Sequence, residues 1–189
     1  MWTVIKADLE ASVDRNRVVG VAFWVHVLGK ALITPQTQVV VIFRMASALA
    51  RTPLRPLAFV LRAVGLAWSG AEIHPDAKIG PGLAVVHSSG VVIGRGVRIG
   101  ADCRLGQGVT LGEQGRGGRV ASWGFPELGD HVTIGAHAVI LGPRRIGTGA
   151  VVGANSVVTT DLPDGAVAVG IPARVVRTVP LEEVLAPRV

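Results

Sequence analysis

The chain has 189 residues, a hydrophobic content of 49% and a formal net charge of +6, and 16 of its 19 basic residues are arginine. Tyrosine is absent and aromatic residues make up 4% of the chain, which excludes a core of large rings and fits one domain with a thin aliphatic interior, with or without a helical appendage. The single cysteine, Cys103, excludes a disulfide framework and a cysteine-based metal site and fits a reducing, cytoplasmic setting.

Residues 1–69 are predicted to form a small helical region. Mostly apolar segments at 18–29, 38–50 and 56–68 are separated by prolines. Within this region the longest uncharged run has 13 residues, at 31–43, which is short of the roughly 18–20 apolar residues that span a bilayer, and no signal peptide is expected. This region contributes +5 of the net charge. A peripheral membrane contact through an interfacial helix is compatible with its arginines, but we expect the helices to pack on the rest of the chain.

A six-residue repeat dominates the second half of the chain. From residue 128 to 158 every sixth residue is aliphatic, and the next residue is usually glycine. The aliphatic positions are Leu128, Ile134, Ile140, Ile146, Val152 and Val158. This period is neither that of a helix nor that of a simple strand, and it indicates a parallel β-helix in which each hexad gives one short strand and one corner.

The repeat starts near residue 70 and its phase slips twice. Aliphatic residues keep the period from Ile73 to Val85 and from Ile93 to Leu111. A slip must be absorbed by a bulge or an extruded loop, because otherwise the inward residues would turn outward. We therefore expect a mainly β protein with a helical region at 1–69, a β-helix at 70–176 with an extruded loop at 113–127, and a tail at 177–189. Cys103 falls on an inward position and is interpreted as core.

The first phase slip contains the strongest candidate for catalysis. His87 is predicted to point outward at a corner, and imidazole is the side chain that suits proton transfer near neutral pH. The alternative is a solvated corner residue. Glu72 lies fifteen residues earlier, three short of one coil, so the two side chains are placed near each other on adjacent coils. A carboxylate there would orient the imidazole.

The second slip contains two aromatic residues, Trp123 and Phe125. Its glycines and arginines suggest a mobile flap, in which aromatic side chains either meet a ligand or tuck against the prism. His131 and His137 share one hexad position but lie on successive faces. With His87 they suggest a zinc site built between subunits, yet no acidic partners lie nearby to orient them, so we interpret them as surface histidines and expect no metal.

These motifs together resemble the serine acetyltransferase group of hexapeptide acyltransferases over residues 70–176. The resemblance rests on Glu72-Ile73-His74-Pro75-Asp76-Ala77-Lys78-Ile79-Gly80, on His87 and Gly90, on Val109-Thr110-Leu111-Gly112, on Ile134-Gly135-Ala136, on Gly153-Ala154-Asn155-Ser156-Val157-Val158 and on Gly170-Ile171-Pro172-Ala173-Arg174. A weaker match at residues 7–11 extends it into the helical region.

The resemblance implies a left-handed β-helix, a homotrimer, and acetyl-CoA bound between neighbouring prisms. It implies that His87 removes the proton from the acceptor hydroxyl with Glu72 as its carboxylate partner. Backbone groups near Gly112, Ala136 and Ala154 would line the cofactor arm and stabilise negative charge. The late arginines Arg174 and Arg177 would meet the phosphates of the cofactor.

The sequence departs from the serine-specific pattern at the acceptor. That pattern has aspartate before the catalytic histidine, where this chain has Val86, and Arg-His-Pro in the loop, where this chain has Gly124-Phe125-Pro126. Only Asp8 is retained from the serine-recognition set. An acceptor carboxylate would lack its usual partners, so Val86, Trp123 and Phe125 are predicted to shape a less polar acceptor site.

The sequence therefore predicts an acetyl-CoA-dependent O-acetyltransferase that acts on a hydroxyl of a sugar, a polysaccharide precursor or a small metabolite. A genuine serine O-acetyltransferase of cysteine biosynthesis and a sugar N-acetyltransferase are alternatives on the same fold. A γ-type zinc carbonic anhydrase-like protein and a non-catalytic scaffold are alternatives of other classes. A nucleic-acid partner is not expected, because no nucleic-acid-binding motif is present.

Overall fold

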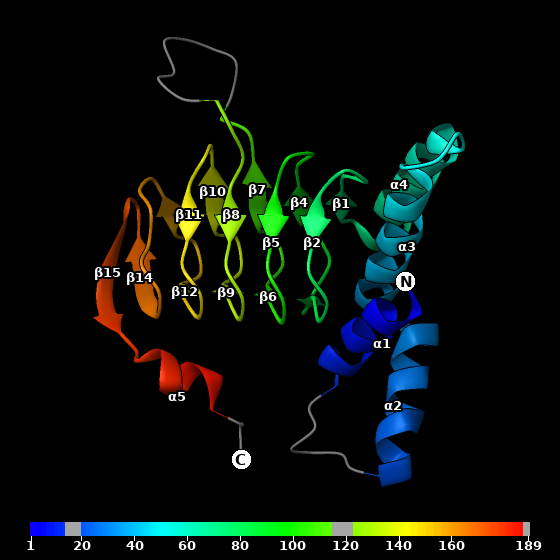
Figure 1. Cartoon of the computed structure of the whole chain (residues 1–189), viewed down its shortest axis with the longest axis horizontal. Coiled ribbons are helices and arrows are strands. Elements are labelled where there is room, and N and C mark those ends of the chain that lie inside the picture. The colour runs from blue at the N-terminus through cyan, green and yellow to red at the C-terminus, as the bar shows by residue number, and fades with distance from the viewer. Residues whose placement is uncertain (14–19, 115–122, 187–189) are drawn as a thin grey trace.

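The computed structural model describes residues 1–13, 20–114 and 123–186, and it shows a helical region at one end of a three-sided β prism (Figure 1). The helices before the prism are α1 (Trp2–Ala11), α2 (Gly20–Ile33), α3 (Pro35–Leu49) and α4 (Arg55–Ser69). A short helix, α5 (Leu181–Leu185), follows the last strand at the other end.

The prism is built from three sheets, which we call A, B and C in the order in which the chain visits them. Sheet A contains β1 (Glu72–Ile73), β4 (Val92–Ile93), β7 (Thr110–Gly112), β10 (Val139–Leu141) and β13 (Val157–Val158). Sheet B contains β2 (Lys78–Ile79), β5 (Arg98–Ile99), β8 (Glu127–Leu128) and β11 (Arg145–Ile146). Sheet C contains β3 (Ala84–Val85), β6 (Arg104–Leu105), β9 (Thr133–Ile134), β12 (Val151–Val152), β14 (Ala166–Gly170) and β15 (Ala173–Thr178). We name the prism edges AB, BC and CA after the sheets that meet there.

The strands stack in parallel, and the prediction of a left-handed β-helix of hexapeptide repeats is confirmed. The inward aliphatic positions of the hexad are buried, from Ile73 at 4% exposed to Val158 at 3%, except Ile79, which is partly buried and packs against the core. Cys103 also lies fully inside, where burial raises the pKa of its thiol to about 11. Its thiol therefore stays protonated and serves as core, as the hexad frame predicted.

The prism corners absorb both phase slips, so the inward residues stay in register. Across the first slip Ile73 pairs with Ile93, and across the second Leu111 pairs with Ile140. The two extra residues of the first slip lie in the corner between β3 and β4, which contains His87. The second slip falls between β7 and β8, at the AB edge, and residues 115–122 of the predicted loop lie outside the described residues.

The corners also explain two of the histidines. The third residue after an inward aliphatic turns the chain with a positive φ, and this position is often glycine, as at Gly82 and Gly149. Asp102, His131, His137 and Asn155 occupy the same position with φ of 54–58°. Aspartate, asparagine and histidine are the non-glycine residues enriched in this conformation. His131 and His137 therefore occupy positions that the turn itself favours.

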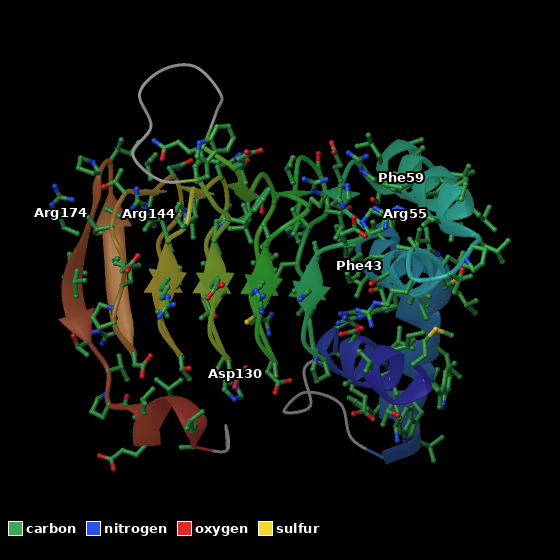
Figure 2. All side chains as sticks on the ribbon, turned by 45° about the horizontal axis from the view of Figure 1, so that its top comes forward. Phe43, Arg55, Phe59, Asp130, Arg144 and Arg174 are labelled. Carbon is green, nitrogen blue, oxygen red and sulfur yellow. The ribbon has the colours of Figure 1, made fainter. Side chains whose placement is uncertain are left out.

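The helical region is attached to the first coil by packing and by ion pairs. Val39, Val40 and Phe43 of α3 join the core of the prism. The guanidinium of Arg55, at the start of α4, lies 2.8 Å from the carboxylate of Asp76 at the first AB corner, and Arg55 and Phe59 are seen at this end of the molecule in Figure 2. At the opposite end β14 and β15 form an antiparallel hairpin, which covers the last parallel strand.

The outer faces of the helices carry many exposed apolar side chains, among them Trp2, Val21, Leu32, Ile33 and Trp68. Among the described residues no single helix is long and apolar enough to cross a bilayer. The pair α2 and α3 meets that test of length and composition only when the two are taken together, and they are bent by 77°.

Candidate active site

His87 lies at the CA edge of the first coil, where the corner is two residues longer than in the next coil. Two hydrogen bonds fix this corner to the end of α4. The Ser88 hydroxyl donates to the Ser69 carbonyl at 2.7 Å, and the Gly90 amide donates to the Gly70 carbonyl at 2.9 Å. Ser88 is buried and is held with Gly90 by these two bonds, whereas His87 is exposed and projects from the prism. The prediction of an outward-pointing corner histidine matches this geometry.

Glu72 begins β1 and lies at the same edge, so the chain brings the two predicted catalytic residues to one side of the prism. The carboxylate of Glu72 accepts a hydrogen bond from the guanidinium of Arg62 on α4. No hydrogen bond joins Glu72 to His87 among the described residues. Arg62 is a polar partner that the sequence analysis missed, and Glu72 would have to share its carboxylate between Arg62 and His87 to act as a dyad.

The predicted cofactor-binding residues are spread over the three edges of the prism. Ala136 and Ala154 lie in corners of the CA edge, above His87 on the following coils. Arg174 is the second residue of β15 and lies near the same edge, at the end of the prism far from the helices (Figure 2). Arg177 pairs with Val167 towards the BC edge, about 10 Å further along the strand at 3.3 Å per residue. Gly112 ends β7 at the AB edge, across sheet A from His87.

Asp8 is buried and bonded within the chain, and its role in binding an acceptor stays a prediction. Its carboxylate is 3% exposed. It accepts bonds from Arg44 Nε at 2.8 Å, from Arg44 Nη2 at 3.0 Å and from the Leu83 amide at 2.9 Å. Arg44 also donates to the carbonyls of Ile79 and Gly80. Asp8 therefore acts as a structural link between α1, α3 and the first coil.

The other predicted acceptor residues occupy two separate places. Val86 is 40% exposed beside His87. Trp123 is 67% exposed at the AB edge. Phe125 is half-buried and packs on the core, with its ring beside Gly94 and Gly96 of the preceding AB corner. A Cβ at Gly96 would lie 2.1 Å from that ring, so the glycine makes room for it. Of the two aromatics, Phe125 tucks against the prism and Trp123 does not.

The histidines do not form a metal cluster among the described residues, where no group of three metal-ligating side chains gathers. His131 lies at the BC edge, whereas His87 and His137 lie at the CA edge. His74 accepts a hydrogen bond on Nδ1 from the Asp76 amide at 3.1 Å. Burial and the nearby Arg62 guanidinium lower the pKa of His74, which favours the neutral ring.

A further polar residue stands beside the predicted acceptor site and was missed in the sequence. Arg104 is exposed on the outer face of β6 and lines cavities with Ala84 and Val86 of the first coil. The sequence shows only that this outward strand position carries a charge. The hexad pattern gives no reason to distinguish it from the outward arginines of sheet B.

Comparisons with known proteins identify similar sequences. Residues 125–160 match the family model described as bacterial transferase hexapeptide (six repeats), and residues 89–114 match the hexapeptide repeat of succinyl-transferase. The chain is 40% identical over 145 residues to a serine acetyltransferase of Helicobacter pylori, covering 77% of this chain and 83% of that protein. It is 36% identical over 176 residues to a serine acetyltransferase of Mycobacterium tuberculosis, covering 93% and 73% respectively.

Solved structures show the same fold. The soybean serine acetyltransferase apoenzyme superimposes with a TM-score of 0.80 at 38% identity, covering 92% of this chain and 68% of that one. A serine acetyltransferase in complex with cysteine gives a TM-score of 0.81 at 32% identity, covering 93% and 69%. One in complex with CoA gives 0.78 at 31% identity, covering 92% and 68%.

Proposed function

The chain belongs to the serine acetyltransferase family of hexapeptide-repeat transferases, which are CoA-dependent O-acetyltransferases, and we propose that it transfers the acetyl group of acetyl-CoA to the hydroxyl of serine. The observation that carries this proposal is the exposed His87, held at the CA edge of a prism whose relatives, at 36–40% identity over most of this chain, are serine acetyltransferases. Solved relatives bound to serine and to CoA support both substrates.

In this proposal His87 acts as the general base. Its imidazole takes the proton of the acceptor hydroxyl while the oxygen attacks the thioester carbonyl carbon. The carbon–sulfur bond then breaks, and the imidazolium returns the proton to the leaving thiolate of CoA. Glu72 would stabilise the imidazolium once its carboxylate reaches the ring. Backbone amides beside Ala136 and Gly112 would stabilise the negative charge on the carbonyl oxygen.

The split of the predicted site between two edges leads us to propose a homotrimer. His87, Ala136 and Ala154 lie at the CA edge, whereas Gly112 and Trp123 lie at the AB edge. Two edges of one prism face different directions, so both sets can contact one acetyl-CoA only if the CA edge of one copy faces the AB edge of the next. A contact between unlike edges closes into a ring when the copies are related by rotation. We place the reaction in the cytoplasm, in keeping with the single buried thiol of Cys103.

A second candidate is transfer to a hydroxyl of a sugar or another small metabolite, which is the acceptor that the sequence analysis predicted. The relatives favour serine over this reading. Two observations keep it as the second candidate: Val86 gives the position beside His87 an apolar side chain, and Phe125 fills a corner of the prism.

The test is thiol release from acetyl-CoA with serine, homoserine, nucleotide sugars, amino sugars and hydroxylated metabolites as acceptors. We expect turnover with serine. Turnover only with a sugar or another hydroxyl compound would replace serine by the second candidate, and acetylation of an amine would indicate N-acetyl transfer. Failure to bind CoA at millimolar concentration would overturn both candidates in favour of a scaffold.

A further inference from the structure

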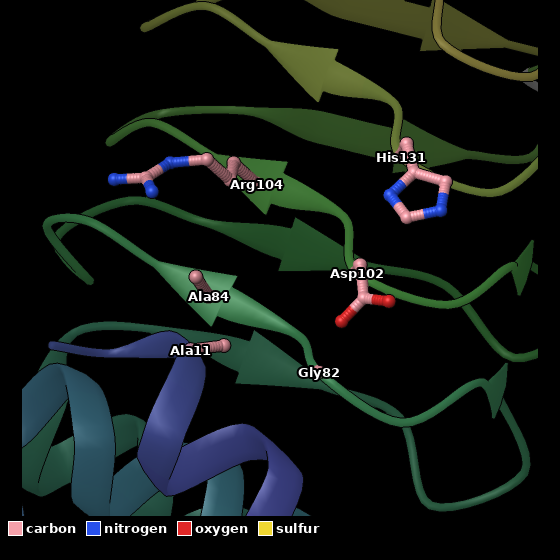
Figure 3. Close-up of a pocket in the computed structure, with 6 residues that line it drawn as sticks. All are labelled: Ala11, Gly82, Ala84, Asp102, Arg104 and His131. Carbon is pink, nitrogen blue, oxygen red and sulfur yellow. The ribbon is translucent and has the colours of Figure 1, made fainter. Parts of the chain in front are cut away.

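A groove runs between the helical region and the outer face of sheet C, and it ends beside the corner that carries His87. One cavity in it has a volume of about 110 Å³ and is lined by Val86 and Arg104 on the prism side and by Lys30 and Gln36 on the helical side. A second cavity, of about 200 Å³, shares Arg104 with the first and extends to Asp102 and His131 (Figure 3). Arg104 therefore stands between the two, with its charge next to the predicted acceptor site.

The charge of Arg104 is uncommitted among the described residues. Its register partners on the neighbouring strands are Ala84 and Thr133, neither of which carries a charge. Its side chain makes no hydrogen bond or ion pair with any described residue. Figure 3 shows the guanidinium extending away from Asp102 and His131. By contrast Arg98, which starts the equivalent strand of sheet B, lies 3.5 Å from the carboxylate of Glu127.

Lys30 adds a second cation across the groove. Its ammonium group donates to the carbonyl of Ser12, and no described carboxylate neutralises it. An ammonium group has three donors, so two are left for a ligand. The amide of Gln36 lines the same cavity. The first cavity thus presents two positive charges and a neutral amide next to Val86, where the family pattern has an acid, whereas the carboxylate of Asp102 lines the second cavity.

We propose that Arg104, with Lys30 opposite, binds the anionic group of the acceptor and thereby directs its hydroxyl towards His87. The proposal rests on the proposed acetyl transfer and adds a substrate-binding subsite to it. An acceptor carboxylate needs charge-assisted donors, which the Gly124-Phe125-Pro126 segment does not provide. A guanidinium suits a carboxylate or a phosphate because it donates two parallel bonds. The anion would be the carboxylate of serine or, for a phosphorylated acceptor, a phosphate.

The kinetic test compares serine with serinamide, which keeps the hydroxyl but lacks the carboxylate, in wild type and Arg104→Met. We expect kcat/KM for serine to fall by about 10- to 100-fold in the variant, mainly through KM, as for loss of a charge-assisted bond. The value for serinamide and the KM for acetyl-CoA should not change, and Arg104→Lys should restore part of the loss. The matched control is Arg145→Met, an exposed arginine at the start of β11 on sheet B. Equal kcat/KM values of the wild-type enzyme for serine and serinamide would overturn the proposal that the subsite binds the serine carboxylate.

Calorimetry with serine and with inorganic phosphate separates this subsite from the catalytic proposal. Binding of either anion that is lost in Arg104→Met and kept in Arg145→Met supports the subsite, even if no acceptor is acetylated and the proposed function fails. Serine alone identifies a carboxylate subsite, and phosphate alone identifies a subsite for a phosphorylated acceptor. Absence of binding to wild type, or binding that does not depend on Arg104, overturns the subsite whatever the outcome of the acetylation assay.

Discussion

At the scale of single residues, the chemistry depends on which polar side chains are left free by the fold. His87 is exposed at an anchored corner, whereas Asp8 and Glu72 are each bonded to an arginine. The role of each polar side chain therefore depends on whether the fold gives it a partner. His87, Asp8 and His74 are expected to be a catalytic, a structural and a titrating residue respectively.

His87 is expected to be the general base, so His87→Ala should lower kcat by about 10²- to 10⁴-fold without weakening CoA binding. His137→Ala is the matched control, because His137 is also exposed at the CA edge but occupies a turn position with positive φ. Thiol release and CoA titration measure the two effects. Equal losses in both variants would mean that the edge, rather than the base, had been damaged.

Asp8→Ala should destabilise the protein by about 3–5 kcal/mol, because it leaves the guanidinium of Arg44, whose side chain is 9% exposed, without its buried partner. Urea unfolding measures this cost. The double variant Asp8→Leu with Arg44→Met should lose less unfolding free energy than Asp8→Ala, because no charge is then left unpaired. If Asp8 instead bound the acceptor, the single variant would keep its stability and raise the KM for serine.

His74 should make stability depend on pH. Burial and Arg62 lower the pKa of the folded imidazole, so the unfolded chain binds the proton at higher pH than the folded chain does. The contribution of neutral His74 to the free energy of unfolding is fully present above the pKa of the unfolded chain, about 6.5, and is lost as pH falls through the pKa of the folded protein. Between pH 7.5 and pH 5.5 the free energy of unfolding should fall less for His74→Asn than for wild type. The asparagine keeps an acceptor for the Asp76 amide. An equal loss in both proteins would remove His74 from the pH dependence.

At the scale of elements, the corners determine what the prism presents to its surroundings. The strands are two to three residues long in most coils, so they hold the inward residues and leave little room for function. Corners of the CA edge carry His87 and the small residues Ala136 and Ala154, and the AB corner before β8 carries Phe125.

Phe125 is expected to anchor the chain where it re-enters the prism. Its ring packs on Gly94 and Gly96, so Phe125→Ala should cost about 1–3 kcal/mol, which is less than a fully buried phenylalanine because the ring is only half-buried. Trp123→Ala, at an exposed position nearby, should change stability by less than about 0.5 kcal/mol. Thermal unfolding of both variants measures the difference. Equal stabilities would show that the ring does not anchor the loop.

The repeat made the prism predictable, because a six-residue period has one common structural meaning, and the inward aliphatics of the strands are buried as it required except Ile79, which is partly buried. The two phase slips likewise located the corner of His87 and the break before Glu127. Ion pairs were not predictable in this way. Asp8 meets Arg44, 36 residues away, and Glu72 meets Arg62, because helices that carry no hexad dock on the first coil. Phe125 fitted two interpretations until the neighbouring glycines of the previous coil were seen beside it.

At the scale of the whole molecule, the predicted site is divided between opposite edges of sheet A. His87 lies at the CA edge and Gly112 at the AB edge. A single chain therefore presents half of the proposed site at each edge, and a homotrimer would contain three complete sites. This arrangement predicts that activity can be restored by mixing two inactive variants.

The first variant is His87→Ala, which removes the base at the CA edge. The second is Gly112→Trp, which should block the cofactor at the AB edge. The protomer tolerates a side chain there, since a Cβ at Gly112 would meet only Leu141, at 3.5 Å. Each variant alone is expected to be inactive. When the two are unfolded together at equal amounts and refolded, about one site in four should combine an intact CA edge with an intact AB edge from the next copy.

Thiol release from the mixture should then reach about a quarter of the wild-type rate, and light scattering should give the mass of three chains. A control mixture of His87→Ala with Glu72→Ala, two lesions at the same CA edge, should recover nothing, because every site in it inherits one of the lesions. A monomeric mass, or a mixture as inactive as its components, would contradict a site shared between copies. Either outcome would mean that Gly112 and His87 do not belong to one shared site.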